Sequence, residues 1–454
     1  MGSPADQVDD PSRLRSGRPA GGRIATVAAS SMLAGLIVAA ALVVFPVLPP
    51  KENILTGALL VGFASGWAML TLLSIRLTAY PQRWAMAPAV FLVLAGVVSL
   101  TGSDPVRAVF GWVWPPALLV LTIWMILRIR RQLPSRRARW ILYPIVTVLA
   151  AAAIGAGYET VREALDARAY PPPGQLVDVG GHRLHLQCTS TGAGGPTVIL
   201  EPGLGATSSD MSWIAPVVAR HTRVCVYDRA GRGWSDPVDG PQDADRVAAD
   251  LHTLLTEAHV EGPYVLAGHS FGGLYVQDFA AQFPDQVAGL VLLDSTAPRN
   301  RPGQPATLAV PTVVDRIFAV VPAAAHLGVG RILAAFDYDT LPPPIRAQAR
   351  ANASTSSFLA SSLREFRAGP TSIRQATALT DLGAKPLVVL TAGTGHNATW
   401  RAAQESLATL STNTRHRIAP DTTHASMLAD QADSAAASQA ILDVVSSVRT
   451  GKPL

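Results

Sequence analysis

The chain has 454 residues, of which 49% are hydrophobic and only 15% charged, and its mean hydropathy of +0.26 is too high for an ordinary soluble globular protein. Residues 1–167 carry 15 Lys and Arg against 8 Asp and Glu, a net charge of +7, whereas the remainder carries a net charge of −2. The second part is therefore near neutral, which excludes an acidic partner such as nucleic acid from its expected functions, and we expect the first part to lie in a membrane.

Five apolar stretches follow one another in the first part of the chain. They lack internal charges and are separated by short polar loops. The first, second and fourth reach the roughly 20 residues that a helix needs to cross a bilayer, and the third and fifth are shorter and each contain a proline. A buried helical core is the alternative interpretation. The stretches lie at about 25–48, 54–75, 85–102, 108–127 and 140–157. We therefore predict an all-α transmembrane bundle of about five helices over residues 24–160, after a basic N-terminal segment at 1–23.

Arginine placement predicts the orientation of this bundle. Arginines gather in the N-terminal segment, in the second connection and in RIRRQLPSRRAR, residues 128–139, and five spans would place all three on one side. Loops rich in Lys and Arg stay in the cytoplasm, so an odd number of spans places everything after about residue 160 outside it. If the fifth stretch does not cross the membrane, the chain after about residue 160 would instead lie in the cytoplasm. We thus expect a multi-pass protein of the cell membrane with an extracytoplasmic second domain.

The second predicted domain, residues 168–454, follows the Pro-rich linker YPPPG at 170–174. It begins with a predicted hairpin, QLVDVGGHRLHLQCTS, and then alternates short apolar strands with amphipathic helices. The strands lie at 196–203, 222–231, 263–268, 287–296, 385–393 and 415–419, and the helices at 242–260, 271–283 and 432–448. This alternation predicts an α/β fold with a mostly parallel sheet covered on both faces. Residues 297–384 interrupt it and predict a helical lid.

The stretch VLAGHSFGGLYV contains the pattern G-x-S-x-G, where a predicted strand meets a predicted helix. Gly268 and Gly272 flank Ser270 by two residues, and larger side chains there would clash in the strained turn that such a serine occupies. The turn lifts the hydroxyl above the sheet at a helix N-terminus, where the helix dipole favours developing negative charge. The pattern therefore predicts Ser270 as a nucleophile.

A serine nucleophile needs a base and an acid, which in this architecture follow it in the order acid, then histidine. His424 lies after the last predicted strand and before the final helix, so a loop can carry its imidazole onto the serine; His396 is the competitor. The loop after 385–393 contains no carboxylate, so Asp294, at the end of the strand beside the nucleophile strand, is the predicted acid. Asp294 could instead only cap its turn, and Asp421 is a weaker candidate.

Acyl chemistry also needs hydrogen-bond donors for an oxyanion. The backbone N–H of Phe271, directly after the nucleophile, is one predicted donor. The second is expected from the Gly-rich loop EPGLG at 201–205, and we assign it to the N–H of Leu204.

Taken together, LEPGLG, VYDRAGRGWSD, VLAGHSFGGLYV, LVLLDST and the late TTH resemble the α/β-hydrolase superfamily over roughly residues 175–450. The chain is similar to serine hydrolases of actinobacterial type that carry an N-terminal membrane region of several spans, although its own membrane region by itself resembles no known family. The resemblance implies a Ser270–His424–Asp294 triad, a lid, and no metal or organic cofactor. The departure is the missing acid after the strand at 385–393. VYDRAGRGWSD, with Asp228, is interpreted as a structural loop near the site.

In this fold the second and fourth strands are neighbours, and they carry the two cysteines, Cys188 and Cys225. A cross-strand disulfide would agree with an oxidising compartment, and two buried thiols are the alternative. The sequence thus predicts a membrane-anchored serine hydrolase that cleaves a small or lipid-like carboxylic ester. Acyl transfer by the same triad, and a ligand-binding module without catalysis, remain alternatives.

Overall fold

The computed structural model describes residues 20–45, 47–189, 194–298 and 312–454. Within it the chain divides into two compact units, Met1–Thr160 and Val161–Leu454. The predicted basic segment at 1–23 and the first part of the predicted lid, at 299–311, lie wholly or mostly outside the described residues.

The first unit is all helical, as predicted. Among the described residues, five helices are long and apolar enough to cross a membrane. They are α1 (Ala20–Val44), α2 (Glu52–Leu77), α3 (Met86–Thr101, preceded by the short helix η2, Arg83–Ala85), α4 (Asp104–Gln132) and α5 (Arg136–Ala169). Helix α5 is longer than the predicted span, because residues 158–169 keep a helix-forming sequence after the apolar run ends. The predicted domain start at residue 168 therefore falls in the last turn of this helix.

Small residues allow α1 and α2 to pack closely. A Cβ atom added at Gly62 of α2 would lie 2.4 Å from the Cα atom of Ala39. One added at Gly66 would lie 2.9 Å from the Ser31 carbonyl oxygen and 3.1 Å from the Cα atom of Gly35. Gly62 and Gly66 are four residues apart and so lie on one face of α2. Small residues at this spacing are typical of helix pairs in membranes, where backbones approach for van der Waals contact.

The second unit contains a mostly parallel sheet of eight strands in the described part of the chain, in the order β1-β2-β4-β3-β5-β6-β7-β8. The strands are β1 (Gln175–Asp178), β2 (Arg183–Thr189), β3 (Val198–Glu201), β4 (Val224–Tyr227), β5 (Tyr264–His269), β6 (Val287–Leu293), β7 (Leu387–Ala392) and β8 (Thr414–Ala419). The β1–β2 hairpin and the β2–β4 pair are antiparallel, and the pairs from β4 to β8 are parallel. The central strands β3, β4 and β5 are buried throughout, which explains their continuous apolar sequences.

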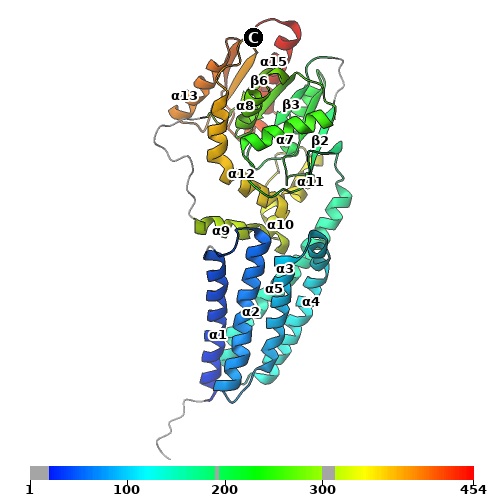
Figure 1. The fold of residues 1–454 in the computed structure, drawn as a ribbon. Coiled ribbons are helices and arrows are strands. Elements are labelled where there is room, and N and C mark those ends of the chain that lie inside the picture. The colour runs from blue at the N-terminus through cyan, green and yellow to red at the C-terminus, as the bar shows by residue number, and fades with distance from the viewer. Residues whose placement is uncertain (1–19, 46, 190–193, 299–311) are drawn as a thin grey trace, which may run out of the picture. The chain divides into compact units, whose positions relative to one another are not determined.

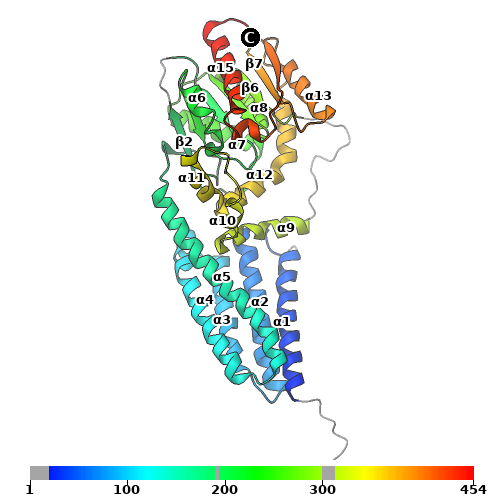
Figure 2. The same cartoon turned by 180° about the vertical axis from the view of Figure 1, so that it is seen from behind.

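Helices cover both faces of this sheet. Helices α7 (Ala244–Glu257) and α8 (Gly272–Gln282) contribute to one apolar core, and α6 (Ala215–Ala219) and α15 (Ser434–Thr450) to the other. Figure 1 shows α7 and α8 in front of the sheet, and Figure 2 shows α6 and α15 on the opposite side. The remaining helices near the carboxyl edge are α13 (Ala398–Leu407) and α14 (Ser426–Ala429). The predicted α/β fold is thus confirmed.

The segment between β6 and β7 is mainly helical in its described part. It contains α9 (Thr312–Val320), α10 (Val329–Ala334), α11 (Pro343–Ala353) and α12 (Ser356–Gln375). Helix α12 begins at an N-cap, Thr355, whose side chain accepts a hydrogen bond from the Phe358 amide. It contacts α7 and α8, so this insertion lies against the sheet-covering helices next to the nucleophile.

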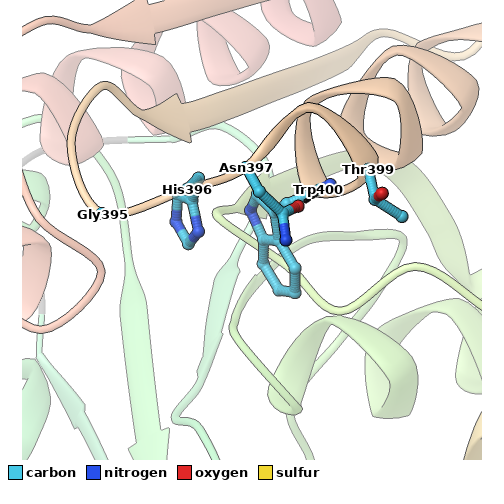
Figure 3. A pocket seen from close by; sticks show the side chains of 5 residues that line it. All are labelled: Gly395, His396, Asn397, Thr399 and Trp400. Atoms are coloured by element: carbon cyan, nitrogen blue, oxygen red, sulfur yellow. Dashed lines mark hydrogen bonds between the residues drawn. The ribbon is translucent and has the colours of Figure 1, made fainter.

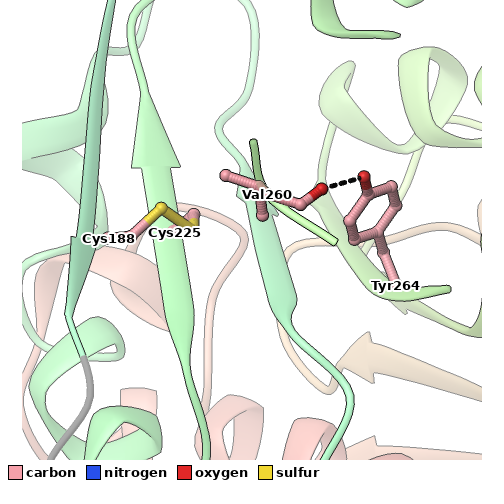
Figure 4. The surroundings of a disulfide bond; sticks show 4 residues. All are labelled: Cys188, Cys225, Val260 and Tyr264. Atoms are coloured by element: carbon pink, nitrogen blue, oxygen red, sulfur yellow. Dashed lines mark hydrogen bonds between the residues drawn. A yellow bond between two sulfur atoms is a disulfide. The ribbon is translucent and has the colours of Figure 1, made fainter. Parts of the chain in front are cut away.

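The two cysteines lie directly opposite each other in the β2–β4 ladder and are joined by a disulfide (Figure 4). Cys225 is fully buried. The bond ties the antiparallel edge of the sheet to its parallel centre, across 37 residues of chain. Figure 4 also shows Tyr264, at the start of β5, donating to the Val260 carbonyl over 2.6 Å.

Candidate active site

Ser270 lies in the turn between β5 and α8. Its φ of +53° is in the left-handed region, which is costly for a residue with a side chain. Its amide donates to the Leu293 carbonyl of β6 over 3.1 Å, and its own carbonyl accepts from the Gly273 and Thr296 amides. These bonds hold the strained turn at the carboxyl edge of the sheet.

The flanking glycines are required by close backbone contacts. A Cβ atom at Gly268 would lie 2.6 Å from the Gly272 carbonyl oxygen, and one at Gly272 would lie 2.5 Å from the Glu201 carbonyl oxygen. Cβ atoms do not occur at such distances. The glycines therefore let α8 start directly against the ends of β3 and β5, with Phe271 as its N-cap residue.

The side chains of Ser270, His424 and Asp294 form one hydrogen-bonded chain. His424 Nε2 lies 2.8 Å from Ser270 Oγ, and His424 Nδ1 lies 2.6 Å from Asp294 Oδ2. Asp294 is fully buried, whereas the His424 side chain is 38% exposed. His424 comes from the loop between β8 and α14, and Asp294 directly follows β6. The imidazole can therefore exchange protons with the serine while the buried carboxylate orients it.

A second imidazole also binds the buried acid. His396 Nε2 lies 2.6 Å from Asp294 Oδ2, and the Trp400 indole Nε1–H donates to Oδ1 over 2.9 Å. The two rings stack with centroids 4.8 Å apart. With Gly395, Asn397 and Thr399 they line a hollow of about 270 Å³ at the start of α13 (Figure 3). His396 was the predicted competitor for the base, but it contacts the acid.

These contacts keep Asp294 ionised. Burial raises the pKa of its carboxyl group, and hydrogen bonds to the carboxylate more than offset that effect, so the net pKa is below the usual value. The donors are His424, Trp400, the Ala392 amide and His396. Within the described residues, the ligand atoms of Asp294, His396 and His424 lie within 4.8 Å of one another, a spacing that could also hold a metal ion.

His269, the residue before the nucleophile, is buried beneath the site. Its Nε2 atom donates to the His424 backbone carbonyl over 3.0 Å. Burial, with a smaller contribution from the nearby His424, lowers the pKa of His269 to about 4. It is therefore neutral at physiological pH and supports the loop that carries His424.

The predicted oxyanion loop passes beside the nucleophile. A Cβ atom at Gly203 would lie 3.1 Å from Ser270 Cβ, so the backbone here is in close contact with the serine. Arg229, from the loop after β4, donates to the carbonyls of Pro202 and Gly203 over 2.9 and 2.7 Å. The sequence predicted a structural role for the loop after β4, through Asp228. Asp228 indeed accepts the Ser208 amide, but the role of Arg229 was not predicted.

The family model for the alpha/beta hydrolase fold matches residues 196–430, which is more than half of the chain. The protein belongs to the α/β-hydrolase family. Ser270, Asp294 and His424 all lie within the matched segment, whereas the helical first unit lies outside it.

Curated relatives match this α/β hydrolase only in part. An uncharacterized protein of Schizosaccharomyces pombe is 35% identical over 151 residues, covering 27% of this chain and 28% of the relative. A probable transporter of Hormonema carpetanum is 29% identical over 136 residues, covering 29% of this chain and 20% of the relative. The chain thus spans less than a third of the length of either. A thermophilic esterase from Thermogutta terrifontis, with 21% identity and a TM-score of 0.46, covers 61% of this chain with 99% of its own.

The residues that sequence reasoning missed in this α/β hydrolase are of two kinds. The first kind follows β7, where the fold suggests a carboxylate: Trp400 was not predicted, and His396 was predicted only as a competing base and not as a partner of Asp294. Arg229 and its partner Glu365, on α12, are 136 residues apart in sequence. The remaining acid candidate, Asp421, is exposed.

Proposed function

We propose that this α/β hydrolase is a membrane-anchored serine hydrolase that cleaves a carboxylic ester through Ser270, His424 and Asp294. The observation that carries the proposal is the continuous chain of 2.8 and 2.6 Å contacts from Ser270 through His424 to Asp294. A nucleophile, a base and an orienting acid in this order are what acyl transfer to a serine requires. Five apolar helices support anchoring in a membrane.

The proposed reaction begins when Ser270 Oγ attacks the ester carbonyl and His424 Nε2 takes the hydroxyl proton. The negative charge that develops on the carbonyl oxygen is accepted by the amides of Phe271 and Leu204. The tetrahedral intermediate then releases the alcohol, which receives the proton from His424. Water attacks the acyl-enzyme with His424 again as base, and the carboxylic acid leaves. Asp294 stays ionised and stabilises the imidazolium.

A fluorophosphonate probe tests this proposal because it labels only an activated serine. The full chain in detergent micelles should be labelled, and Ser270→Ala and His424→Ala should not. His396→Ala should retain labelling, because His396 contacts the acid and not the serine. A folded wild-type protein that is neither labelled nor active on a panel of acyl esters would reject catalysis and favour a binding module. Product analysis with an added alcohol separates hydrolysis from acyl transfer.

We also propose that the catalytic domain lies outside the cytoplasm. Five spans with arginine-rich connections on one side support this orientation, and so does the Cys188–Cys225 disulfide, since such bonds persist in oxidising compartments. A protease added to intact cells should digest a tag placed after Leu454 and spare one placed before Met1. Digestion of the N-terminal tag alone would reverse the orientation.

A further inference from the structure

Four buried charged side chains form a cluster beside the proposed oxyanion loop. Glu201 ends β3, Arg229 and Arg232 lie in the loop after β4, and Glu365 lies on α12 of the insertion. None of the four contacts Ser270 or His424 in the described hydrogen bonds. Buried ion pairs are often no more stabilising than apolar groups of the same size, so a cluster of this kind calls for a role other than stability.

Glu365 is the centre of this cluster. Its carboxylate accepts from Arg229 Nε over 2.7 Å and from Arg229 Nη2 over 3.2 Å, which is a two-pronged contact. Arg232 Nε donates to the same carboxylate over 2.9 Å. Arg229 also pairs with Glu201. Burial raises the pKa of Glu365, but the two arginines more than offset this and lower it to about 2, so the group is ionised.

The cluster holds the backbone on both sides of Leu204. Arg229 Nη2 donates to the Gly203 carbonyl over 2.7 Å, and the Gly205 amide donates to Glu365 Oε2 over 3.3 Å. In a trans peptide the carbonyl of one residue and the N–H of the next point in opposite directions. Because the Gly203 carbonyl is turned toward the guanidinium, the Leu204 N–H points away from it. Both peptide planes that adjoin the Leu204 Cα atom are therefore fixed.

The loop held in this way is the one in contact with the nucleophile. The Gly203 Cα atom borders Ser270 Cβ and the His269 ring, as the positions of an added Cβ atom demonstrate. Oxyanion donors act chiefly because they are oriented before the reaction and need no rearrangement during it. A peptide next to Ser270 whose orientation is set by charged side chains meets this requirement.

We propose that Arg229 and Glu365 are positioning residues that orient the Leu204 amide as an oxyanion donor, so that the donor is set only while helix α12 is docked on the loop. The inference rests on the proposed esterase function. It makes the insertion part of the catalytic apparatus, since Glu365 belongs to the insertion while the amide it positions belongs to the sheet edge. Neither residue takes or gives a proton in the reaction.

Arg229→Lys tests this inference. Lysine keeps the positive charge, but a single ammonium group cannot form a bidentate contact with Glu365 and also donate to the carbonyls of Pro202 and Gly203. We expect kcat to fall about 10- to 100-fold with KM within about threefold, since loss of a whole oxyanion donor costs about 10²- to 10³-fold. Arg183→Lys is the matched control: Arg183 forms an exposed two-pronged pair with Asp236, and its variant should keep wild-type kcat.

The decisive measurement is the ratio of kcat/KM for an ester to that for its thionoester, whose sulfur is a poor hydrogen-bond acceptor. A misoriented donor should lower this ratio about tenfold, whereas general structural damage lowers both rates equally. An unchanged ratio in folded Arg229→Lys would overturn the inference. If Arg229→Lys does not fold, the ester-to-thionoester ratio of kcat/KM is measured for the nearly isosteric variant Glu365→Gln, and an unchanged ratio there overturns the inference. Wild-type protein without ester turnover or Ser270 labelling would instead reject the proposed function.

Discussion

Replacing Asp294 by asparagine tests the role of the buried acid. Asp294 Oδ1 accepts from the Trp400 indole over 2.9 Å and from the Ala392 amide over 3.1 Å, and both of these groups can only donate. If the asparagine NH₂ group took the place of Oδ1, it would face these two buried donors. Each unsatisfied donor would then lower stability by about 1–3 kcal/mol. Imidazoles can change tautomer, so we expect the NH₂ group to face His424 instead. His424 would then carry its proton on Nε2, where it cannot accept one from Ser270.

The expected result is a loss of about 10⁴-fold in kcat, which is the size found when a triad aspartate becomes asparagine and corresponds to about 5 kcal/mol. KM should change little, because Asp294 is buried and does not reach the substrate. Steady-state kinetics on a chromogenic ester measure both constants. Asp421→Asn is the matched control, since Asp421 is exposed and three residues from His424. A folded Asp294→Asn enzyme within tenfold of wild-type kcat would refute the reasoning.

Two further predictions concern stability. His269 has its pKa lowered to about 4, so between about pH 6.5 and 4 only the unfolded chain binds its proton, and stability falls as pH falls, by about 3 kcal/mol. As the pH is lowered from about 7 to about 4.5, Tm should drop less steeply in His269→Gln than in the wild-type protein. Parallel curves of Tm against pH for the two proteins would contradict this prediction. Removing the disulfide with Cys188→Ala and Cys225→Ala should cost about 4 kcal/mol for its 37-residue separation, and a reductant should lower Tm in wild type alone.

The strands and the nucleophile could be predicted from the sequence because their signals are local. The apolar run before Gly268, the glycines around Ser270 and the turn at Gly180-Gly181 each fix the backbone of a few neighbouring residues. The order of strands follows from the family resemblance, and it placed Cys188 beside Cys225. Asp294 was reached by elimination, since the loop after β7 offers no carboxylate.

The charged cluster could not be predicted because its meaning depends on distant partners. In sequence, Arg229 and Arg232 resemble the solvated arginines of an ordinary loop, and Glu365 resembles a residue on the exposed face of α12. Only the fold brings them together, across more than 130 residues. The contacts of His396 and Trp400 with Asp294 were missed for a related reason: an imidazole or an indole is recognised as a carboxylate's partner only when the distance between them is known.

The register of β5 and β6 has a consequence for motion in the site. His269 pairs with Leu293, so Ser270 and Asp294 each occupy the first position beyond the last paired residues of adjacent central strands, and both have positive φ values. Ser270 and Asp294 are thereby attached to the ends of two strands that are hydrogen-bonded to each other within the sheet. Only His424 comes from a loop. Fluctuations that gate turnover should consequently be concentrated in residues 420–425, and imidazole relaxation measured by NMR would report them directly.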